Sequence, residues 1–151
     1  MTTASIDHDR IATLIPHAGA MCLLERCDSW DRDRIVCIAT NHRRADNPLR
    51  SASGLLSACA IEYAAQAMAL HGALIGAEDG TPASPGYLAS ARGVHLHRLR
   101  LDDVEGDLRI EAQRGAGDAR QILYTFDVSH AGAPIATGRA AVVLNTPIDL
   151  R

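Results

Sequence analysis

The feature that most constrains this fold is a long apolar run at residues 54–75, Gly-Leu-Leu-Ser-Ala-Cys-Ala-Ile-Glu-Tyr-Ala-Ala-Gln-Ala-Met-Ala-Leu-His-Gly-Ala-Leu-Ile. Its alanines, leucines and methionine favour a helix, for which Ser57 is a candidate N-cap. A helix that is apolar on nearly all faces must be enclosed by other elements. Glu62 and Gln66 interrupt the run, and a buried carboxylate is costly unless it has a partner or a chemical task. Glu62 is therefore the first candidate functional residue.

Short alternating runs on both sides of this helix predict an antiparallel sheet. We expect a helix at residues 7–14, strands at residues 21–27 and 34–40 joined by a turn at 28–33, and a loop over residues 41–53. A loop at residues 77–86 then precedes four strands, at residues 87–101, 107–114, 121–130 and 135–144, which we expect to form a meander. One curved sheet wrapped around one helix is an α+β fold, and 151 residues predict a single domain, residues 1–151.

Composition excludes several classes of function. A net charge of -3 and an aromatic content of 3% argue against a nucleic-acid partner. All 15 basic residues are arginines, which excludes a Schiff-base lysine and a P-loop lysine. Glu62 and Gln66 make the apolar run a poor membrane span, and the N-terminus has no apolar segment typical of a secretory signal. The four cysteines are Cys22, Cys27, Cys37 and Cys59. They lack a Cys-x-x-Cys spacing and indicate reduced thiols, so we expect a cytoplasmic protein.

Three motifs, in order along the chain, resemble the 3-hydroxyacyl-acyl-carrier-protein dehydratases. Residues 14–21, Leu-Ile-Pro-His-Ala-Gly-Ala-Met, with Leu-Leu-Glu-Arg at 23–26, are similar to that family's opening. Residues 61–67, Ile-Glu-Tyr-Ala-Ala-Gln-Ala, resemble its helix motif Glu-x-x-Ala-Gln-Ala, and residues 90–94 and 105–107 resemble its strand and Pro-Gly-Asp turn. The more specific resemblance is to the dehydratase of aryl-polyene and related polyketide clusters, through Pro-His-x-Gly-x-Met, Asn-Pro-Leu-Arg and Ile-Glu-Tyr-x-Ala-Gln.

The resemblance implies a hot-dog fold, in which an antiparallel sheet encloses a long central helix. It implies a dimer at least, with acyl tunnels at the subunit interface, and either a homodimer or a heteromer with another hot-dog protein. The expected activity is loss of water from a 3-hydroxyacyl thioester to give a trans-2-enoyl thioester, in fatty-acid-like, polyene or polyketide synthesis. The substrate would be carried on the phosphopantetheine of acyl carrier protein, with no other cofactor and no metal.

Dehydration of this kind needs a base for the α-proton and an acid for the departing hydroxyl, tasks that suit a histidine and a carboxylic acid. Glu62 is the candidate acid, and the alternative is a carboxylate paired with an arginine across a dimer interface. His17, which lies in the matching Pro-His motif, is the candidate base. Its alternative is a loop histidine that caps the first helix or bonds a backbone carbonyl.

Four further residues are candidates for substrate binding. Gln66 lies one helical turn after Glu62 and is expected to orient it. The backbone N–H groups of Leu56 and Ser57, at the predicted helix start, are expected to bind the thioester oxyanion. Arg50 is expected to meet phosphopantetheine or an acidic carrier protein, although a plain solvated surface arginine is equally consistent with the sequence.

One departure from the family pattern keeps other functions open. The related fatty-acid dehydratases carry their catalytic histidine just ahead of the helix, where this chain has Asn47 and Pro48. His42, a few residues upstream, is a second candidate base. The vacated position favours a non-catalytic partner subunit that binds acyl carrier protein, and a hot-dog thioesterase using Glu62 is a further alternative. His95 and His97 have the spacing of a metal pair, but lining a surface or tunnel is the preferred interpretation.

Overall fold

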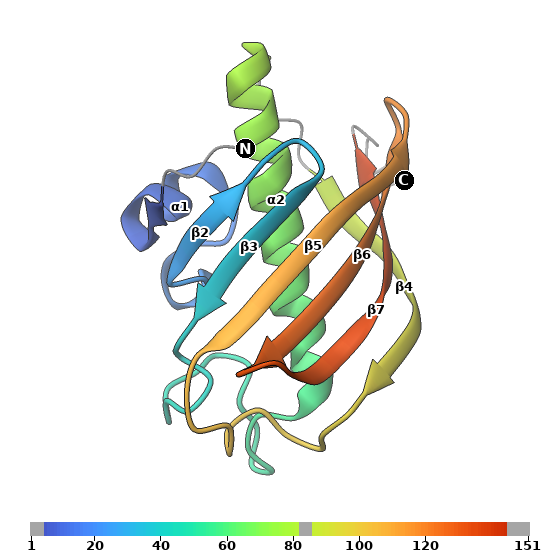
Figure 1. Ribbon diagram of the computed structural model, residues 1–151. Helices are drawn as coiled ribbons and strands as arrows, with labels where there is room; N and C mark the ends of the chain where they lie inside the picture. The colour runs from blue at the N-terminus through green and yellow to red at the C-terminus, as the bar shows by residue number, and fades with distance from the viewer. Residues whose placement is uncertain (1–4, 82–85, 145–151) are drawn as a thin grey trace, which may run out of the picture.

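In the computed structural model, which describes residues 5–81 and 86–144, one long helix lies against a curved antiparallel sheet (Figure 1). The helices are α1 (His8–Leu14) and α2 (Ala60–Asp79), with 3₁₀ turns η1 (Gly19–Met21) and η2 (Ser57–Cys59). The strands are β1 (Ile6–Asp7), β2 (Arg26–Trp30), β3 (Arg34–Ala39), β4 (Gly86–Leu96), β5 (Leu108–Gly117), β6 (Gln121–His130) and β7 (Ala133–Leu144). The predicted α+β class is confirmed.

The seven strands form one sheet in the order β1-β2-β3-β5-β6-β7-β4, with every neighbouring pair antiparallel. The predicted hairpin is present as β2 and β3, and β5, β6 and β7 pair in succession. The prediction of a four-strand meander is wrong for β4, because β4 pairs with β7 at the far edge and β3 takes the place beside β5. Pairing between strands distant in sequence depends on where the helix carries the chain, which local alternation does not record.

The sheet buries α2 by alternation along its strands. In β5, Leu108, Ile110 and Ala112 are fully buried against the helix side, while the residues between them are partly exposed. Tyr63 and Leu70 of α2 are also fully buried in the same core. Each such side chain contributes about 1.5–3 kcal/mol relative to an exposed one, so packing rather than helix propensity holds α2 in place.

Both ends of α2 differ from the sequence prediction. The helix proper begins at Ala60 after the turn η2, and the prediction that Ser57 caps it is wrong, since no side chain bonds the first amides of η2 or α2. At the other end α2 continues through Asp79 and stops at Gly80, whose φ of 71° is the left-handed conformation that glycine adopts without strain. The predicted loop at residues 77–86 is therefore helical in its first part, and its centre, residues 82–85, lies outside the described residues.

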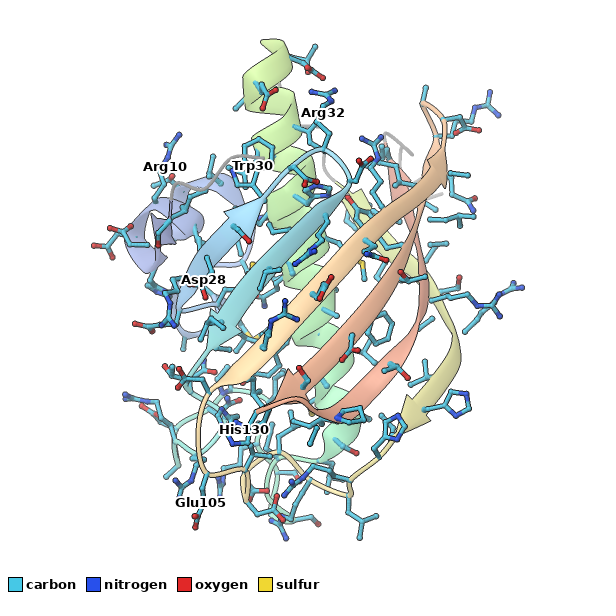
Figure 2. All side chains as sticks on the ribbon, viewed as in Figure 1. Arg10, Asp28, Trp30, Arg32, Glu105 and His130 are labelled. Carbon is cyan, nitrogen blue, oxygen red and sulfur yellow. The ribbon has the colours of Figure 1, made fainter. Side chains whose placement is uncertain are left out.

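An ion pair ties the far end of α2 to the sheet. Arg32, in the turn between β2 and β3, donates two hydrogen bonds of 2.9 Å each to the carboxylate of Asp79. Figure 2 shows Arg32 beside this end of α2, with Trp30 just below it. Trp30 is almost fully buried and packs edge-on against His71 of α2, with ring centroids 6.5 Å apart. The β2–β3 hairpin thus fixes the position of the second half of the helix.

The first strand of that hairpin lies later in the chain than predicted. Strand β2 spans Arg26–Trp30, whereas the sequence predicted a strand at residues 21–27 and a turn at 28–33. Residues 28–30 are part of the strand, since Ser29 pairs with Val36 and Trp30 with Ile35. The segment before β2 forms η1 and then an extended stretch, in which Met21 and Leu23 bond the side chain of Gln66 on α2 and only Glu25 bonds strand β3, through Ile38.

The segment Ser57–Asp79 is long and apolar enough to cross a membrane, with a mean hydropathy of 1.2 in its most apolar window. In the structure, 61% of that window is buried inside the fold. The segment is therefore the core helix of the domain that the sheet encloses.

Candidate active site

The structure brings together the two side chains that the sequence selected for chemistry. His17 Nε2 lies 3.3 Å from Glu62 Oε1. Both side chains are partly exposed, His17 to 25% and Glu62 to 33%, so the pair is sheltered but open to a ligand. A base and an acid in direct contact can exchange a proton without solvent. Their catalytic roles stay a prediction.

Glu62 occupies the first turn of α2. The unpaired backbone N–H groups at a helix N-terminus carry a partial positive charge, which favours a carboxylate at this position. Within this chain, over residues 5–81 and 86–144, His17 and Gln66 are the polar contacts of Glu62, and the alternative of an arginine across a dimer interface stays a prediction. The predicted helix began earlier, so it is the observed start at Ala60 that puts Glu62 in the first turn.

Gln66 is the side chain that assembles the site. Its Nε2 donates to Glu62 Oε1 at 3.2 Å and to the carbonyl of Met21 at 2.7 Å, and its Oε1 accepts from the N–H of Leu23 at 2.9 Å. The residue is fully buried, so it orients Glu62 as predicted but offers no free group to a substrate. The sequence did not reveal that Gln66 also holds the backbone of the loop after His17, because only the fold brings that backbone within reach.

The loop that carries His17 is anchored at both ends. On one side the N–H of Ile15 bonds the carbonyl of Ile11 at 3.2 Å and ends α1, and the Ile15 side chain is buried. On the other side Met21 is held by Gln66. His17 Nδ1 is buried and has no hydrogen-bond partner in the described part of the chain, so the contact with Glu62 is what orients the ring. The alternative of a helix-capping histidine has no support in these contacts.

The second candidate base, His42, does not reach Glu62. It is almost fully buried, and its Nε2 lies 3.0 Å from the carbonyl of Val104. Burial lowers the pKa of His42, which keeps the ring neutral. Its other nitrogen, Nδ1, is buried without a partner among the residues that the structure describes. These contacts make His42 a support for the loop after residue 100.

Asn47 lies where the sequence resemblance implies a histidine, and its amide makes three hydrogen bonds within the fold. Nδ2 donates to the carbonyl of Asn41 and to the hydroxyl of Tyr63, each at 3.0 Å, and Oδ1 accepts from the N–H of Leu49 at 2.9 Å. Tyr63 in turn donates to Asn41 Oδ1 at 2.7 Å, and burial raises the pKa of Tyr63 to about 12. Asn47 therefore fastens the 41–49 loop to α2 and offers nothing to a substrate.

Of the two backbone N–H groups predicted to bind an oxyanion, that of Ser57 is already hydrogen-bonded within the fold. The N–H of Ser57 donates to the carbonyl of Leu99 at 3.0 Å, so the expectation that it binds an oxyanion is wrong for this structure. Leu56 pairs with Arg100 in an isolated bridge, and no partner for its N–H is found in the described ranges. Leu56 is 47% exposed, so its amide stays a candidate donor.

Arg50 lies in a charge cluster near the start of α2. Its Nη2 is 3.5 Å from Asp102 Oδ2, and the same carboxylate receives two hydrogen bonds from Arg100. The hydrogen bonds from Arg100 lower the pKa of Asp102 to about 2, so the carboxylate is charged at neutral pH. Arg50 therefore shares its carboxylate with a better-placed arginine, and its partly exposed guanidinium stays a candidate for an anionic ligand.

The remaining histidines do not build a metal site. His95 on β4 and His97 just after it are exposed, with ring centroids 6.4 Å apart. No group of three or more His, Cys, Asp or Glu side chains in the described residues is arranged to hold a metal ion. His71 is fully buried, where its Nδ1 meets Tyr124 Oη at 2.9 Å and its Nε2 meets the carbonyl of Asp31 at 2.6 Å.

Comparison with solved structures identifies the fold. One chain of the dehydratase heterocomplex ApeI:P from Xenorhabdus doucetiae superposes with a TM-score of 0.81 and 23% identity, covering 94% of this chain and 93% of that one. AziG from S. sahachiroi superposes with a TM-score of 0.59 and 20% identity, over 87% and 97% of the two chains. A hypothetical thioesterase from Streptococcus pneumoniae, solved with coenzyme A, superposes with a TM-score of 0.57 and 12% identity, over 78% and 83%. At these identities the likeness shows the fold alone, and it confirms the predicted hot-dog fold.

No protein of curated function matches the sequence significantly. A family model does match, over residues 9–150, and its description is ApeP-like, ApeP dehydratase. The match spans the loop with His17, the helix with Glu62 and Gln66, and all of the sheet beyond β1. This chain belongs to the ApeP-like family of dehydratases.

Proposed function

We propose that this protein removes water from a 3-hydroxyacyl thioester carried on acyl carrier protein and leaves a trans-2-enoyl thioester. The observation that carries the proposal is the 3.3 Å contact between His17 Nε2 and Glu62 Oε1 in a chain of a dehydratase family. The reaction breaks the C2–H and C3–O bonds, forms the C2=C3 double bond and releases one water molecule. It consumes no oxidant and needs no cofactor other than the phosphopantetheine that holds the substrate.

In the proposed mechanism His17 takes the proton from C2 while Glu62 donates its proton to the hydroxyl that leaves C3. The pair is then an imidazolium beside a carboxylate. Because the two groups are in contact, the proton on His17 Nε2 returns to Glu62 Oε1 and restores the starting state. Gln66 holds Glu62 in place through this cycle, and the free N–H of Leu56 is the proposed donor to the thioester oxygen.

A second candidate function has a specific observation in its favour. Asn47 replaces the histidine of the related dehydratases and is wholly occupied with loop contacts. The similar chain from Xenorhabdus doucetiae comes from a dehydratase heterocomplex. A non-catalytic subunit that binds acyl carrier protein and supports a second, active hot-dog protein would fit both facts. We propose the catalytic role first, because a histidine and a carboxylate lie in contact with each other at a partly exposed position.

The test is intact-mass spectrometry of a 3-hydroxyacyl carrier protein incubated with this protein, alone and with a hot-dog partner subunit. Loss of the mass of one water molecule is expected. Replacing Glu62 by Gln or His17 by Ala is expected to slow the loss by about 10²–10⁴-fold, the usual worth of a general acid or base. The matched control is His95→Gln, an exposed histidine outside the site, which is expected to leave the rate unchanged.

Three results would count against this proposal. Full activity of the Glu62→Gln variant refutes the role of the pair. Water loss that requires the partner subunit and is unaffected by both substitutions supports the non-catalytic function instead. Release of free thiol without water loss identifies a thioesterase. We further propose a cytoplasmic location, a homodimer or a hot-dog heteromer as the working assembly, and a place in fatty-acid-like, polyene or polyketide synthesis.

A further inference from the structure

The face of the sheet that points away from α2, here called the outer face, carries two arginines directly opposite each other. Tyr124 and Phe126 of β6 are buried on the helix side, so Thr125 between them lies on the outer face. Arg139 of β7 pairs with Thr125, and Arg92 of β4 pairs with Arg139. Both arginines are exposed and lie on the two strands at the far edge of the sheet (Figure 1).

This arrangement places two positive charges side by side without an acid to balance them. Like charges directly opposite each other on antiparallel strands destabilise the pairing. Within residues 5–81 and 86–144, neither Arg92 nor Arg139 has an ion pair or a side-chain hydrogen bond. Elsewhere on the outer face the charges are paired, since Arg109 of β5 donates to Glu111 at 2.8 Å. The unbalanced pair therefore indicates a place for an anion.

The backbone of β4 brings the two guanidinium groups together. Its pairing with β7 shifts register between Arg92 and His95, and Gly93 has a φ of 58°. Such a bulge kinks the strand and redirects the side chains beside it. A Cβ atom added at Gly93 would lie 3.5 Å from Arg139 Nη2 and 3.7 Å from Arg139 Nε. The Arg139 guanidinium therefore lies over β4 at the residue that follows Arg92.

Both arginines line a hollow of about 700 Å³ on this part of the sheet. Hydrogen-bond donors share the lining, including the hydroxyls of Ser90 and Thr125 and the amide of Gln113. Leu123, which is 44% exposed, adds an apolar surface. No aspartate or glutamate of the described residues lines the hollow. It has the size of a small-molecule site and the charge to attract an anion.

We propose that Arg92 and Arg139 bind the phosphate group of a small phosphate monoester, with its organic part against Leu123. A phosphate monoester carries a charge of about −1.5 to −2 at neutral pH, which balances two guanidinium groups, whereas a single carboxylate balances one. The planar arginine fork donates two parallel hydrogen bonds to phosphate oxygens. Because α2 with Glu62 lies on the other side of the sheet, this site is separate from the candidate active site and does not depend on the proposed dehydratase function.

The test is a titration of the ¹⁵N-labelled full chain with three probes, followed by NMR of the amide signals. Phenyl phosphate is expected to bind with a Kd on the order of 1 mM and to shift the signals of residues 90–93, 123–125 and 139–141. Inorganic phosphate, which lacks the organic part, is expected to shift the same signals at several-fold higher concentration. Benzoate, which has the ring but a single charge, is expected to bind at least about tenfold more weakly than phenyl phosphate.

Three variants test the residues. Arg92→Gln and Arg139→Gln are each expected to weaken phenyl phosphate about tenfold or more, the usual worth of a hydrogen bond to a charged group. Arg139→Lys keeps the charge but loses the fork, and is expected to weaken binding about threefold or more. Since both side chains are exposed, the thermal unfolding midpoint is expected to match wild type, which separates lost binding from lost folding.

The matched control is Arg10→Gln. Arg10 is an exposed arginine on α1, outside the hollow, and its side chain has no ion pair in the described part of the chain (Figure 2). This variant is expected to bind phenyl phosphate within about twofold of wild type, since it changes the net charge by the same amount as Arg139→Gln.

Four results would overturn the inference. The first is the absence of saturable binding of phenyl phosphate up to about 20 mM. The second is equal weakening by Arg10→Gln, which indicates attraction by net charge alone. The third is an affinity that neither glutamine variant at Arg92 or Arg139 changes. The fourth is equal binding of benzoate, which identifies a site for carboxylates such as those of an acidic protein surface.

Discussion

Replacing Gln66 by Leu is expected to destabilise the fold and the active site together. Leu has nearly the volume of Gln, so the substitution removes the three hydrogen bonds of a fully buried amide and leaves little cavity. The N–H of Leu23 loses its bond to Gln66, and water cannot replace that bond because Leu23 is only 2% exposed. The carbonyl of Met21 is less enclosed and recovers part of its solvation.

The magnitude follows from those two backbone groups. An unsatisfied buried donor costs about 1–3 kcal/mol, and the partly solvated carbonyl adds a smaller amount, so the free energy of unfolding is expected to fall by about 2–4 kcal/mol. For a domain of this size each kcal/mol corresponds to a shift of about 2–4 °C in Tm. The loop after His17 also loses its attachment to α2, so water loss from substrate is expected to fall as well.

The assay is urea unfolding followed by circular dichroism, with Gln113→Leu as the matched control. Gln113 is an exposed amide on β5 with no hydrogen bond from its side chain among the described residues, and its loss is expected to change the free energy by less than about 0.5 kcal/mol. A Gln66→Leu variant that unfolds within 1 kcal/mol of the control would refute the structural role of this amide. Unchanged dehydration in a destabilised variant would refute its role in placing His17.

Two further predictions concern the lower end of the sheet. Burial lowers the pKa of His42, so below about pH 6.5 this histidine binds a proton more readily in the unfolded chain than in the folded chain. The free energy of unfolding is therefore unaffected by His42 above about pH 6.5 and falls as the pH drops below that value. His42→Gln is therefore expected to flatten the pH dependence of the urea midpoint between pH 7 and 5, and an unchanged slope would contradict this. Gly106 has a φ of 146° and an added Cβ would meet the ring of His130, which lies by the loop with Glu105 (Figure 2). Gly106→Ala is expected to cost about 1–3 kcal/mol in thermal unfolding, whereas Gly72→Ala, in open space, is expected not to destabilise the fold.

Elements defined by local pattern were predicted well. The strand at residues 121–130 is found with those bounds as β6, because its strict alternation and its flanking turns both act within a few residues. The short N-terminal helix was also predicted, and Asp7 caps it by accepting from the N–H of Arg10. In these segments neighbouring residues alone determine which backbone conformation satisfies the hydrogen bonds.

Predictions failed where a distant residue supplies the hydrogen bonds. A strand was predicted at residues 21–27, but the Gln66 side chain bonds the carbonyl of Met21 and the N–H of Leu23, so the first part of this stretch does not pair with a strand and its backbone reaches β3 only from Glu25 onward. Ser57 read as a cap and an oxyanion donor, but its N–H meets Leu99, which lies 42 residues further along the chain. Strand β4 read as the first strand of a meander, but its place at the sheet edge depends on the path of α2.

The sequence by itself determined a buried helix with one carboxylate and an antiparallel sheet to enclose it, because hydrophobic periodicity and helix propensity are local. Only the tertiary structure decided that His17 rather than His42 meets Glu62, since 45 residues of chain separate the pair and the fold alone brings them to 3.3 Å. It also decided that Gln66 bonds both Glu62 and the backbone of the loop after His17. Such contacts depend on long-range packing, for which neighbouring residues carry no signal.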